Sequence, residues 1–329
     1  MPVLLTSGLW STLCRQTLKR LIPVLFLVLL GSSELCALMA ERSALAEKSL
    51  LLDIAAAEQL VIAVGERGHI LRSDDAGHSW QQAEVPTRTT LTGVFLLDSN
   101  LAWAVGHDQV ILRSEDGGKS WRQVFSAPEE ESPLLDVWFA DARRGYAIGA
   151  YGRFLETGDG GESWTSRWIS EDDYHLNKMF AVGSYLFLAA EAGQVYRSAD
   201  GGENWDGLLT PYEGSFFGGL GLGPDSLMVF GLRGNLFRSS DAGETWQQVA
   251  TATEANLTDA VALKDGRLLV GGLAGTLLVS QDNGESFSLV QQPDRQGTAA
   301  LLQVESGIFI RVGEGGLQPL STKLLSTGE

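Results

Sequence analysis

The chain has 329 residues, of which 44% are hydrophobic and 20% are charged, and this composition is that of an ordinary globular protein. Its 24 Lys and Arg residues stand against 41 Asp and Glu residues, and the net charge of −17 disfavours binding to nucleic acid or to anionic lipid head groups. The 39 glycines follow no collagen-like period and therefore indicate many tight turns between short strands.

The N-terminal 46 residues predict a secretory signal peptide. A basic flank of Arg15, Lys19 and Arg20 precedes an uncharged apolar run at residues 21–30, which is the layout of an export signal. That run is shorter than the roughly 20 residues that a membrane-spanning helix needs. We therefore expect the mature protein in the periplasm or an equivalent extracytoplasmic space. An uncleaved N-terminal membrane anchor is the alternative.

Cleavage is expected after residue 46, because residues 44–46 read Ala-Leu-Ala, the small-residue pattern of a cleavage site. Ala37 and Ala40 are alternative cleavage positions. Both cysteines, Cys14 and Cys36, lie in the leader. The mature chain is therefore expected to contain no disulfides and to depend on packing for its stability, for which about 280 residues suffice.

Six segments of the remaining chain share the pattern S/T-x-D-x-G-x-x-W/F, here called the Asp-box. They occupy residues 73–80, 114–121, 157–164, 198–205, 239–246 and 280–287. Their aspartates are Asp75, Asp116, Asp159, Asp200, Asp241 and Asp282, and their aromatic residues are Trp80, Trp121, Trp164, Trp205, Trp246 and Phe287. Successive aspartates are 41, 43, 41, 41 and 41 residues apart. Six matches at nearly constant spacing indicate a tandem structural repeat.

A second motif recurs in phase before each Asp-box, where the chain reads V-G-x-x-G or a variant. Its leading residues are Gly65, Gly106, Gly149, Ala190, Gly231, Gly272 and Gly313. Each unit also holds four strand signals, which in the first unit lie at residues 50–56, 60–64, 69–73 and 80–85. Seven repeats of about 41 residues with four strands each predict an all-β, seven-bladed β-propeller over residues 47–329.

The seventh unit differs from the others because it has no Asp-box. Its residues 317–325 are weakly patterned, so this blade is expected to lack an outer strand. One way to close the ring is for residues 47–52 to supply that strand.

The Asp-boxes are expected to be structural. Each lies on the hairpin between a blade's third and fourth strands, where the carboxylate can accept hydrogen bonds from the N–H groups of its own turn. The glycine permits a positive φ, and the aromatic side chain packs between sheets. Six aspartates on separate blades cannot converge on one centre. We therefore expect no metal site and no cofactor.

The phased pattern V-G-x-x-G-x-I-x-x-S-x-D-G-G-x-S-W, clearest at residues 106–121 and 149–164, resembles that of the photosystem II stability and assembly factor family. These are single Asp-box propellers named for a chloroplast reading frame, and the resemblance covers residues 48–321. It implies a lumenal or periplasmic, non-enzymatic chaperone that holds a membrane protein during assembly, with an arginine patch at the contact. It implies no photosynthetic role, since members also occur in bacteria without photosynthesis. Sialidases, xyloglucan-cleaving glycosidases and sortilin-type receptors are more distantly similar.

The partner is expected to bind the face opposite the Asp-boxes, which is formed by the turns between second and third strands and by the links between blades. Arginine binds carboxylates bidentately, and aromatic residues are enriched at interfaces. The expected partner-binding residues are Arg67, Tyr151, Arg153, Trp168, Tyr174, Tyr212, Phe217 and Arg233. Alternatively, the arginines pair with neighbouring acids such as Glu66, Asp172 and Asp173.

A glycoside hydrolase or sugar-binding propeller of sialidase-like type is the alternative function. The mature chain has no F/Y-R-I-P motif, sialidases of this type have six blades, and the xyloglucan-cleaving enzymes enclose a cleft between two propellers. The sequence also shows no phosphate-binding glycine loop, nucleophile elbow or His/Cys cluster. We therefore expect a non-catalytic, monomeric assembly factor, scaffold or accessory subunit for a membrane protein complex on its extracytoplasmic side.

Overall fold

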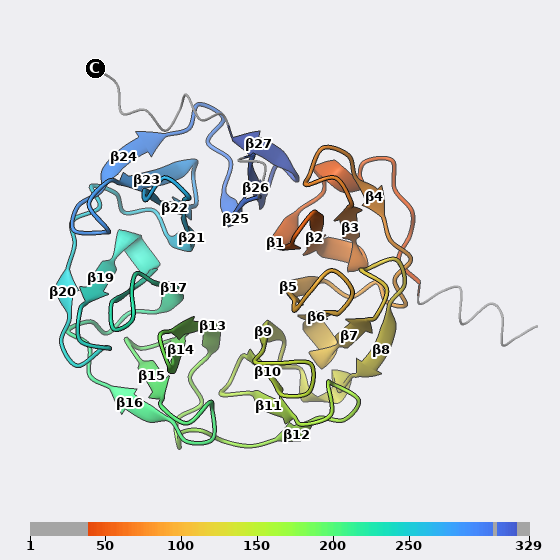
Figure 1. Ribbon diagram of the computed structural model, residues 1–329, viewed down its shortest axis with the longest axis horizontal. Coiled ribbons are helices and arrows are strands. Elements are labelled where there is room, and N and C mark those ends of the chain that lie inside the picture. Colours follow the sequence, from red (N-terminus) through yellow and green to blue (C-terminus); the bar gives the residue numbers. More distant parts are fainter. Residues whose placement is uncertain (1–38, 305–307, 321–329) are drawn as a thin grey trace, which may run out of the picture. The chain divides into compact units, whose positions relative to one another are not determined.

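A computed structural model describes residues 39–304 and 308–320. From Ala40 onwards these residues form one compact unit, in which seven antiparallel sheets follow one another around a ring (Figure 1). Six of the sheets have four strands, and the seventh has three in the part of the chain that is described. The predicted seven-bladed propeller is therefore confirmed.

The strands run outwards from the centre of the ring in chain order within each blade. They are β1 Leu51–Ala57, β2 Leu60–Gly65, β3 Ile70–Ser73 and β4 Gln81–Gln82 in blade 1; β5 Leu91–Leu96, β6 Ala102–Gly106, β7 Ile111–Ser114 and β8 Arg122–Phe125 in blade 2; β9 Leu134–Phe139, β10 Gly145–Gly149, β11 Phe154–Thr157 and β12 Thr165–Ser166 in blade 3; β13 Leu176–Val182, β14 Tyr185–Ala190, β15 Val195–Ser198 and β16 Asp206–Leu208 in blade 4; β17 Phe216–Gly221, β18 Leu227–Gly231, β19 Leu236–Ser239 and β20 Gln247–Gln248 in blade 5; β21 Leu257–Ala262, β22 Leu268–Gly272, β23 Thr276–Ser280 and β24 Ser288–Gln291 in blade 6; and β25 Thr298–Gln303, β26 Phe309–Gly313 and β27 Gln318–Leu320 in blade 7.

Helices are few and short in this structure. They are the 3₁₀ turns η1 Ala46–Lys48, η2 Glu66–Gly68, η3 His107–Gln109, η4 Pro128–Glu130 and η5 Leu232–Gly234. Among the described residues, no helix is long and apolar enough to cross a membrane.

Each innermost strand contains a β-bulge at the same level of the ring. In blade 1, for example, Leu51 pairs with Gly65 and Asp53 with Val64, so that Leu52 is the extra residue. The same register shift occurs in all seven inner strands. A bulge bends a strand and redirects its side chains, and here it turns the side chains near the bulge towards the axis of the ring.

The ring closes by packing of blade 1 against blade 7, without a shared sheet. Leu51 and Val61 of blade 1 are fully buried in one apolar cluster with Ala300 and Val312 of blade 7. Residues 47–52 therefore do not complete the seventh blade, contrary to expectation, because Leu51 already pairs with β2 as part of the innermost strand of blade 1. Of the weakly patterned residues 317–325, where the seventh blade is expected to lack an outer strand, residues 321–325 lie outside the described residues.

The segment before blade 1 lies along that blade's outer edge and then reaches blade 7. The N–H of Ala40 donates to the carbonyl of Val85 over 2.9 Å, and the N–H of Ser43 donates to the side-chain oxygen of Gln82 over 2.8 Å. Farther along, the carbonyl of Glu47 accepts a 2.8 Å hydrogen bond from the N–H of Leu317.

Neighbouring blades are also joined through the Asp-boxes. The guanidinium of Arg197 in β15 donates to the carbonyl of Ala242 over 2.9 Å, and Arg238 in β19 donates to that of Asn283 over 3.2 Å. Both acceptors belong to the Asp-box of the following blade. These two Asp-boxes therefore support their own turns and also anchor the blades before them.

Candidate functional site

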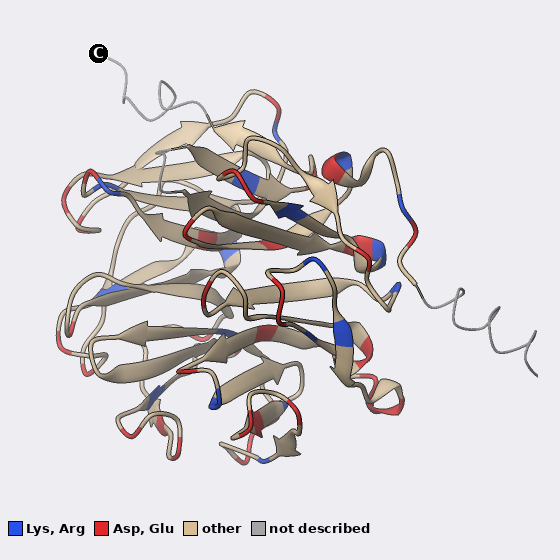
Figure 2. Ribbon diagram, turned by 45° about the vertical axis from the view of Figure 1, so that its right-hand side comes forward, with Lys and Arg blue, Asp and Glu red and all other residues tan. Residues whose placement is uncertain are grey.

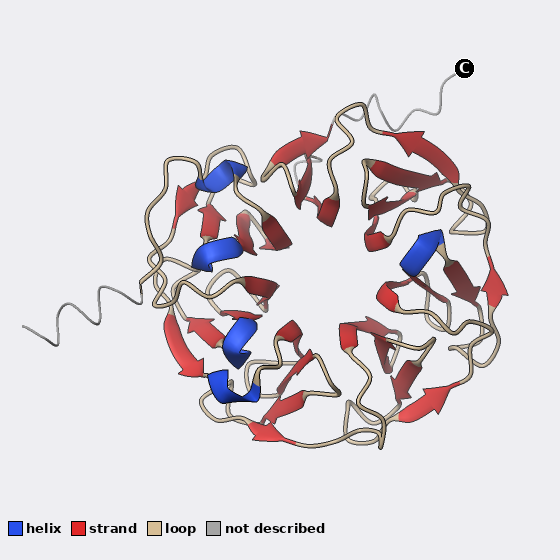
Figure 3. Ribbon diagram, turned by 180° about the vertical axis from the view of Figure 1, so that it is seen from behind, coloured by secondary structure: helices blue, strands red, loops and turns tan. Residues whose placement is uncertain are grey.

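The face opposite the Asp-boxes, here called the upper face, is seen in Figure 3, where the short helices point towards the viewer. It is formed by the turns between second and third strands, each lying against the link that leaves its own blade. A Cβ added to Gly68 would lie 2.1 Å from the carbonyl oxygen of Thr87, and one added to Gly234 would lie equally close to that of Thr253. The second glycine of the V-G-x-x-G motif is thus required by close approach as well as by its positive φ.

The residue before that glycine, or before Gln109 in blade 2, occupies the tip of each upper turn in the left-handed conformation. These tips are Arg67, Asp108, Tyr151, Ala192, Arg233 and Ala274, with φ between 54° and 57° in blades 1 to 6. A left-handed tip directs its side chain away from the blade. The same position therefore carries arginine in blades 1 and 5, aspartate in blade 2, tyrosine in blade 3 and alanine in blades 4 and 6.

Arg67 and Arg233 are exposed at their tips and form no side-chain hydrogen bond or ion pair with any described residue. Arg153 differs from them, because the tip of blade 3 is Tyr151 and Arg153 follows two residues later. Its side chain is 19% exposed, and its guanidinium pairs with the carboxylate of Glu130. Arg153 is thus paired with a neighbouring acid, as the alternative interpretation expects, whereas the side chains of Arg67 and Arg233 are free of bonds to the described residues.

The expected aromatic residues also divide into exposed side chains and side chains that are packed against the protein. Tyr151 and Trp168 are 55% and 66% exposed on the upper face. Tyr212 is half-buried against Phe216 and Phe237, and its hydroxyl donates to the carbonyl of Leu232. These contacts make Tyr212 a packing residue, so it contributes little free surface.

The two remaining candidates are also half-buried. Tyr174 accepts a 2.9 Å hydrogen bond at its carbonyl from the N–H of Gly152, which ties the link after blade 3 to the upper turn of that blade. Phe217 is the bulge residue of β17 and lines a cavity of about 110 Å³ on the axis of the ring. Of the eight predicted residues, Arg67, Tyr151, Trp168 and Arg233 remain as exposed candidates.

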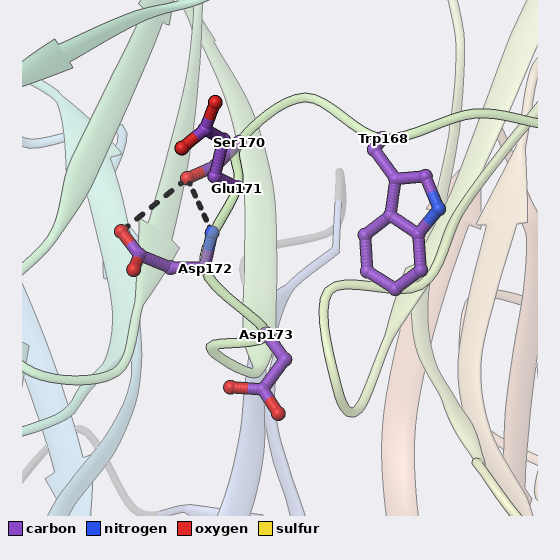
Figure 4. Close-up of a pocket in the computed structure, with 5 residues that line it drawn as sticks. All are labelled: Trp168, Ser170, Glu171, Asp172 and Asp173. Atoms are coloured by element: carbon purple, nitrogen blue, oxygen red, sulfur yellow. Dashed lines mark hydrogen bonds between the residues drawn. The ribbon is translucent and has the colours of Figure 1, made fainter.

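A second cavity, of about 570 Å³, lies beside Trp168 in the link between blades 3 and 4. Its other lining residues are Ser170, Glu171, Asp172 and Asp173. Figure 4 shows the link arching from Trp168 to Ser170 and returning through Asp172 and Asp173, with the carboxylates of Glu171 and Asp172 directed away from the indole. The upper face therefore offers exposed arginines on blades 1 and 5 and an acidic, aromatic pocket between blades 3 and 4.

The axial cavity holds a charged cluster that the sequence analysis did not identify. The Nζ of Lys178 lies 3.0 Å from Asp136 and 4.0 Å from Asp53, and Asp259 lines the same cavity. These residues directly follow the bulges of four different inner strands. Their signal in the sequence is a charged residue twelve or thirteen positions before the first glycine (or Ala190) of the V-G-x-x-G motif.

The aspartates of this cluster also join blades. Asp53, Asp136 and Asp259 each accept a hydrogen bond from a backbone N–H of the next blade, over 2.9, 2.8 and 2.7 Å. Burial raises the pKa of Asp259 to about 7, although Lys178 lowers it. Burial likewise raises the pKa of Asp53.

The Asp-box carboxylates are committed to their own turns on the lower face. In blade 4, Asp200 accepts from the backbone N–H of Asn204 over 2.9 Å, from its side-chain amide over 2.8 Å, and from the hydroxyl of Ser198 over 2.8 Å. These bonds lower the pKa of Asp200 to about 2. The other five boxes repeat the hydroxyl and backbone bonds.

Charge is spread unevenly over the molecule. Acidic residues gather in the loops and turns, as Figure 2 shows, while several Lys or Arg residues lie on strands. Within the described ranges, no group of three or more His, Cys, Asp or Glu residues is placed to hold a metal ion.

The sequence matches one family of known proteins. The family model described as photosynthesis system II assembly factor YCF48 matches residues 39–130 and 125–255. None of the curated proteins matches the chain.

Solved structures share the fold at low sequence identity. A structure of YCF48 bound to D1 peptide is 18% identical with a TM-score of 0.68, and the match covers 83% of this chain and 92% of that one. YCF48 from Cyanidioschyzon merolae is 16% identical with a TM-score of 0.66, covering 85% and 96% of the two chains. The WD40 propeller domain of Doa1 has the same TM-score at 11% identity, covering 85% and 94%.

These structural likenesses establish the propeller fold. The family model goes further, because its two matches together span more than half of the sequence. The chain therefore belongs to the family of the photosynthesis system II assembly factor YCF48.

Proposed function

We propose that this protein is a non-catalytic assembly factor or scaffold that holds an extended segment of a membrane protein on its upper face, in an extracytoplasmic compartment. The observation that carries the proposal is the pair of exposed arginines, Arg67 and Arg233, at equivalent left-handed tips in a chain of net charge −17. An acidic protein that presents unpaired cations at repeated positions offers a specific contact for carboxylates.

Two further observations support the proposal. The chain belongs to a family of assembly factors, and one solved member of similar fold is a complex with D1 peptide. The upper face also exposes Tyr151 between the two arginines in blade order, and an exposed aromatic side chain supplies apolar contact area. We propose that the partner segment contacts Arg67, Tyr151 and Arg233.

The test is retrieval of the partner from solubilised membranes by the tagged mature protein. The double variant Arg67→Glu/Arg233→Glu should remain folded, because surface substitutions usually change stability by less than about 0.5 kcal/mol. It should retrieve at least tenfold less of the protein that the wild type retrieves. Rising salt should weaken the wild-type interaction, since exposed charge contacts are screened.

Lys119→Glu/Arg143→Glu is the matched control. These two cations are exposed on the lower face, so reversing them makes the same change in net charge. The proposal requires this variant to retrieve the partner as the wild type does. Equal loss in both double variants would show that only net charge matters. Cleavage of a sugar polymer by the wild type but not by Arg67→Glu/Arg233→Glu would favour the glycoside hydrolase instead.

A further inference from the structure

The backbone of the exposed tip residue Tyr151 is held by a histidine of the link that leaves its own blade. The N–H of Tyr151 donates to Nδ1 of His175 over 3.1 Å, and the two rings meet edge to face with their centroids 4.8 Å apart. A ring nitrogen that accepts a hydrogen bond carries no proton, so this contact requires the neutral imidazole with its proton on Nε2. His175 therefore holds the tip of blade 3 only in its neutral form.

Blade 5 makes the same contact with a side chain that does not titrate. The N–H of its tip residue Arg233 donates to Oδ1 of Asn256 over 3.0 Å. Asn256 and His175 occupy equivalent places, because each directly precedes the first strand of a blade. Their carbonyls also accept an N–H from the upper turn of that blade, over 2.9 and 3.1 Å. Two of the three proposed contact residues are thus held by a side-chain acceptor, and the one in blade 3 can lose it by protonation.

A carboxylate lies next to the same imidazole nitrogen. Oε2 of Glu191 is 3.2 Å from Nδ1 of His175 and accepts a 3.0 Å hydrogen bond from the backbone N–H of His175. An imidazole gains its second proton between about pH 8 and 5, and both of its nitrogens then donate. A protonated Nδ1 can donate to Glu191 and can no longer accept from Tyr151. Protonation therefore exchanges a bond to blade 3 for a bond within blade 4.

Other titratable groups lie on the elements that pack against His175. Arg153 lies on the upper turn of blade 3, where its guanidinium is bonded to Glu130. Asp173 and Tyr174 precede His175 on its own link, and Asp173 is exposed to solvent. The side chain of His175 is itself 32% exposed, so that protons reach it directly from solvent.

We propose that His175 is a pH-responsive positioning residue, which holds Tyr151 in place for the partner segment when neutral and releases it when protonated. The inference rests on the proposed function for the partner, and it adds how binding is regulated. Tyr151 has a φ of 55°, and a left-handed conformation is costly for a residue other than glycine. The tip keeps this conformation less firmly once its N–H has lost the acceptor. Partner binding should therefore weaken as pH falls from 8 to 5.

The state of the tip is measured without any partner, on the mature protein labelled with ¹⁵N-tyrosine. The chain has six tyrosines, so the amide signal of Tyr151 is readily assigned from the Tyr151→Phe variant. From pH 8 to pH 5 this signal should shift, and the protection of the amide against hydrogen exchange should fall about fivefold. His175→Asn keeps an acceptor at the δ position, as Asn256 does in blade 5, and should abolish both changes. An unchanged wild-type signal, or the same changes in His175→Asn, would overturn the inference.

Partner retrieval at equal ionic strength tests the regulation. The wild type should retrieve about fivefold less partner at pH 5 than at pH 8, whereas His175→Asn should retrieve equal amounts at the two pH values. His107→Asn is the matched control, because His107 is exposed on the upper turn of blade 2, and it should keep the wild-type response. Equal retrieval by the wild type at both pH values would overturn the regulation.

The two proposals fail in distinguishable ways. A wild type that retrieves no partner at either pH would refute the proposed function, while the amide signal of Tyr151 would still show whether His175 controls the tip. Partner retrieval with an amide signal that ignores pH would refute the role of His175 alone.

Discussion

At the scale of single residues, the Asp-box is the part of the structure that the sequence predicts best. All bonds to its carboxylate lie within seven residues, so spacing alone determines which side chain and which N–H the carboxylate reaches. The axial cluster could not be predicted in the same way. Asp53 and Lys178 lie on different blades, and only closure of the ring brings them within 4.0 Å.

Asp200→Ala tests the structural role of an Asp-box. The substitution leaves the N–H of Asn204 and the hydroxyl of Ser198 without their acceptor. We expect a fall in Tm of about 3–6 °C and unchanged partner retrieval by the folded protein. Asp206→Ala, an exposed aspartate with no side-chain bond to a described residue, is the control and should leave the Tm unchanged. Loss of retrieval at wild-type Tm would place the binding face with the Asp-boxes.

Asp259→Asn tests the pH dependence of the inner ring. The pKa of Asp259 is about 7 in the folded chain and 3.8 as an unperturbed carboxyl. Between these values the folded state binds a proton that the unfolded state does not, so stability falls as pH rises from about 4 through 7. Asparagine cannot ionise but can still accept the N–H of Leu301. We expect the variant to melt a few degrees above the wild type at pH 8.

Thermal melts at pH 5, 6, 7 and 8 provide the measurement. The gap in Tm between variant and wild type should shrink as pH falls below 7, where the wild-type carboxyl is also neutral. Asp225→Asn, an exposed aspartate on a turn of blade 5, should melt with the wild type throughout. A gap that is constant with pH would show that the Asp259 carboxyl does not titrate in this range.

At the scale of elements, strand positions follow from local pattern and bulges do not. In blade 1 the expected strands at residues 50–56, 60–64 and 69–73 are observed at Leu51–Ala57, Leu60–Gly65 and Ile70–Ser73. The fourth is reduced to Gln81–Gln82, because an outer strand pairs on one side only and diverges sooner. The bulges could not be predicted in this way, because they depend on how the inner strands curve within the closed ring and not on the pattern of a single repeat.

The segment at residues 40–48 bears on the proposed export signal. Ala46 is 3% exposed in the cluster between blades 1 and 7, and Arg42 pairs with Glu84. Cleavage after residue 46 would remove these contacts, whereas cleavage after Ala37 would keep them. We propose export with cleavage after Ala37, so N-terminal sequencing of the cellular protein should begin at Leu38. A sequence that begins at Met1 would indicate the uncleaved anchor.

At the scale of the whole molecule, the two faces of the ring were predicted more securely than the side chains that are free on them. Alternation of strand direction places the upper turns and the Asp-boxes on opposite faces in any such propeller. Arg153 shows the limit of this reasoning, because its partner Glu130 comes from the link before blade 3 and competes with solvent for the guanidinium. Position along a repeat indicates a face, and contacts between elements decide which side chains remain free on it.

The central claim is that the partner binds the upper face, and site-specific photocrosslinking tests it most directly. Ala274 and Asn283 are matched sites, since both are exposed, left-handed tip residues of blade 6, one on an upper turn and the other in an Asp-box. A photoreactive side chain at position 274 should crosslink the membrane partner in cells, and the same side chain at position 283 should not. Crosslinking from position 283 alone would contradict the account.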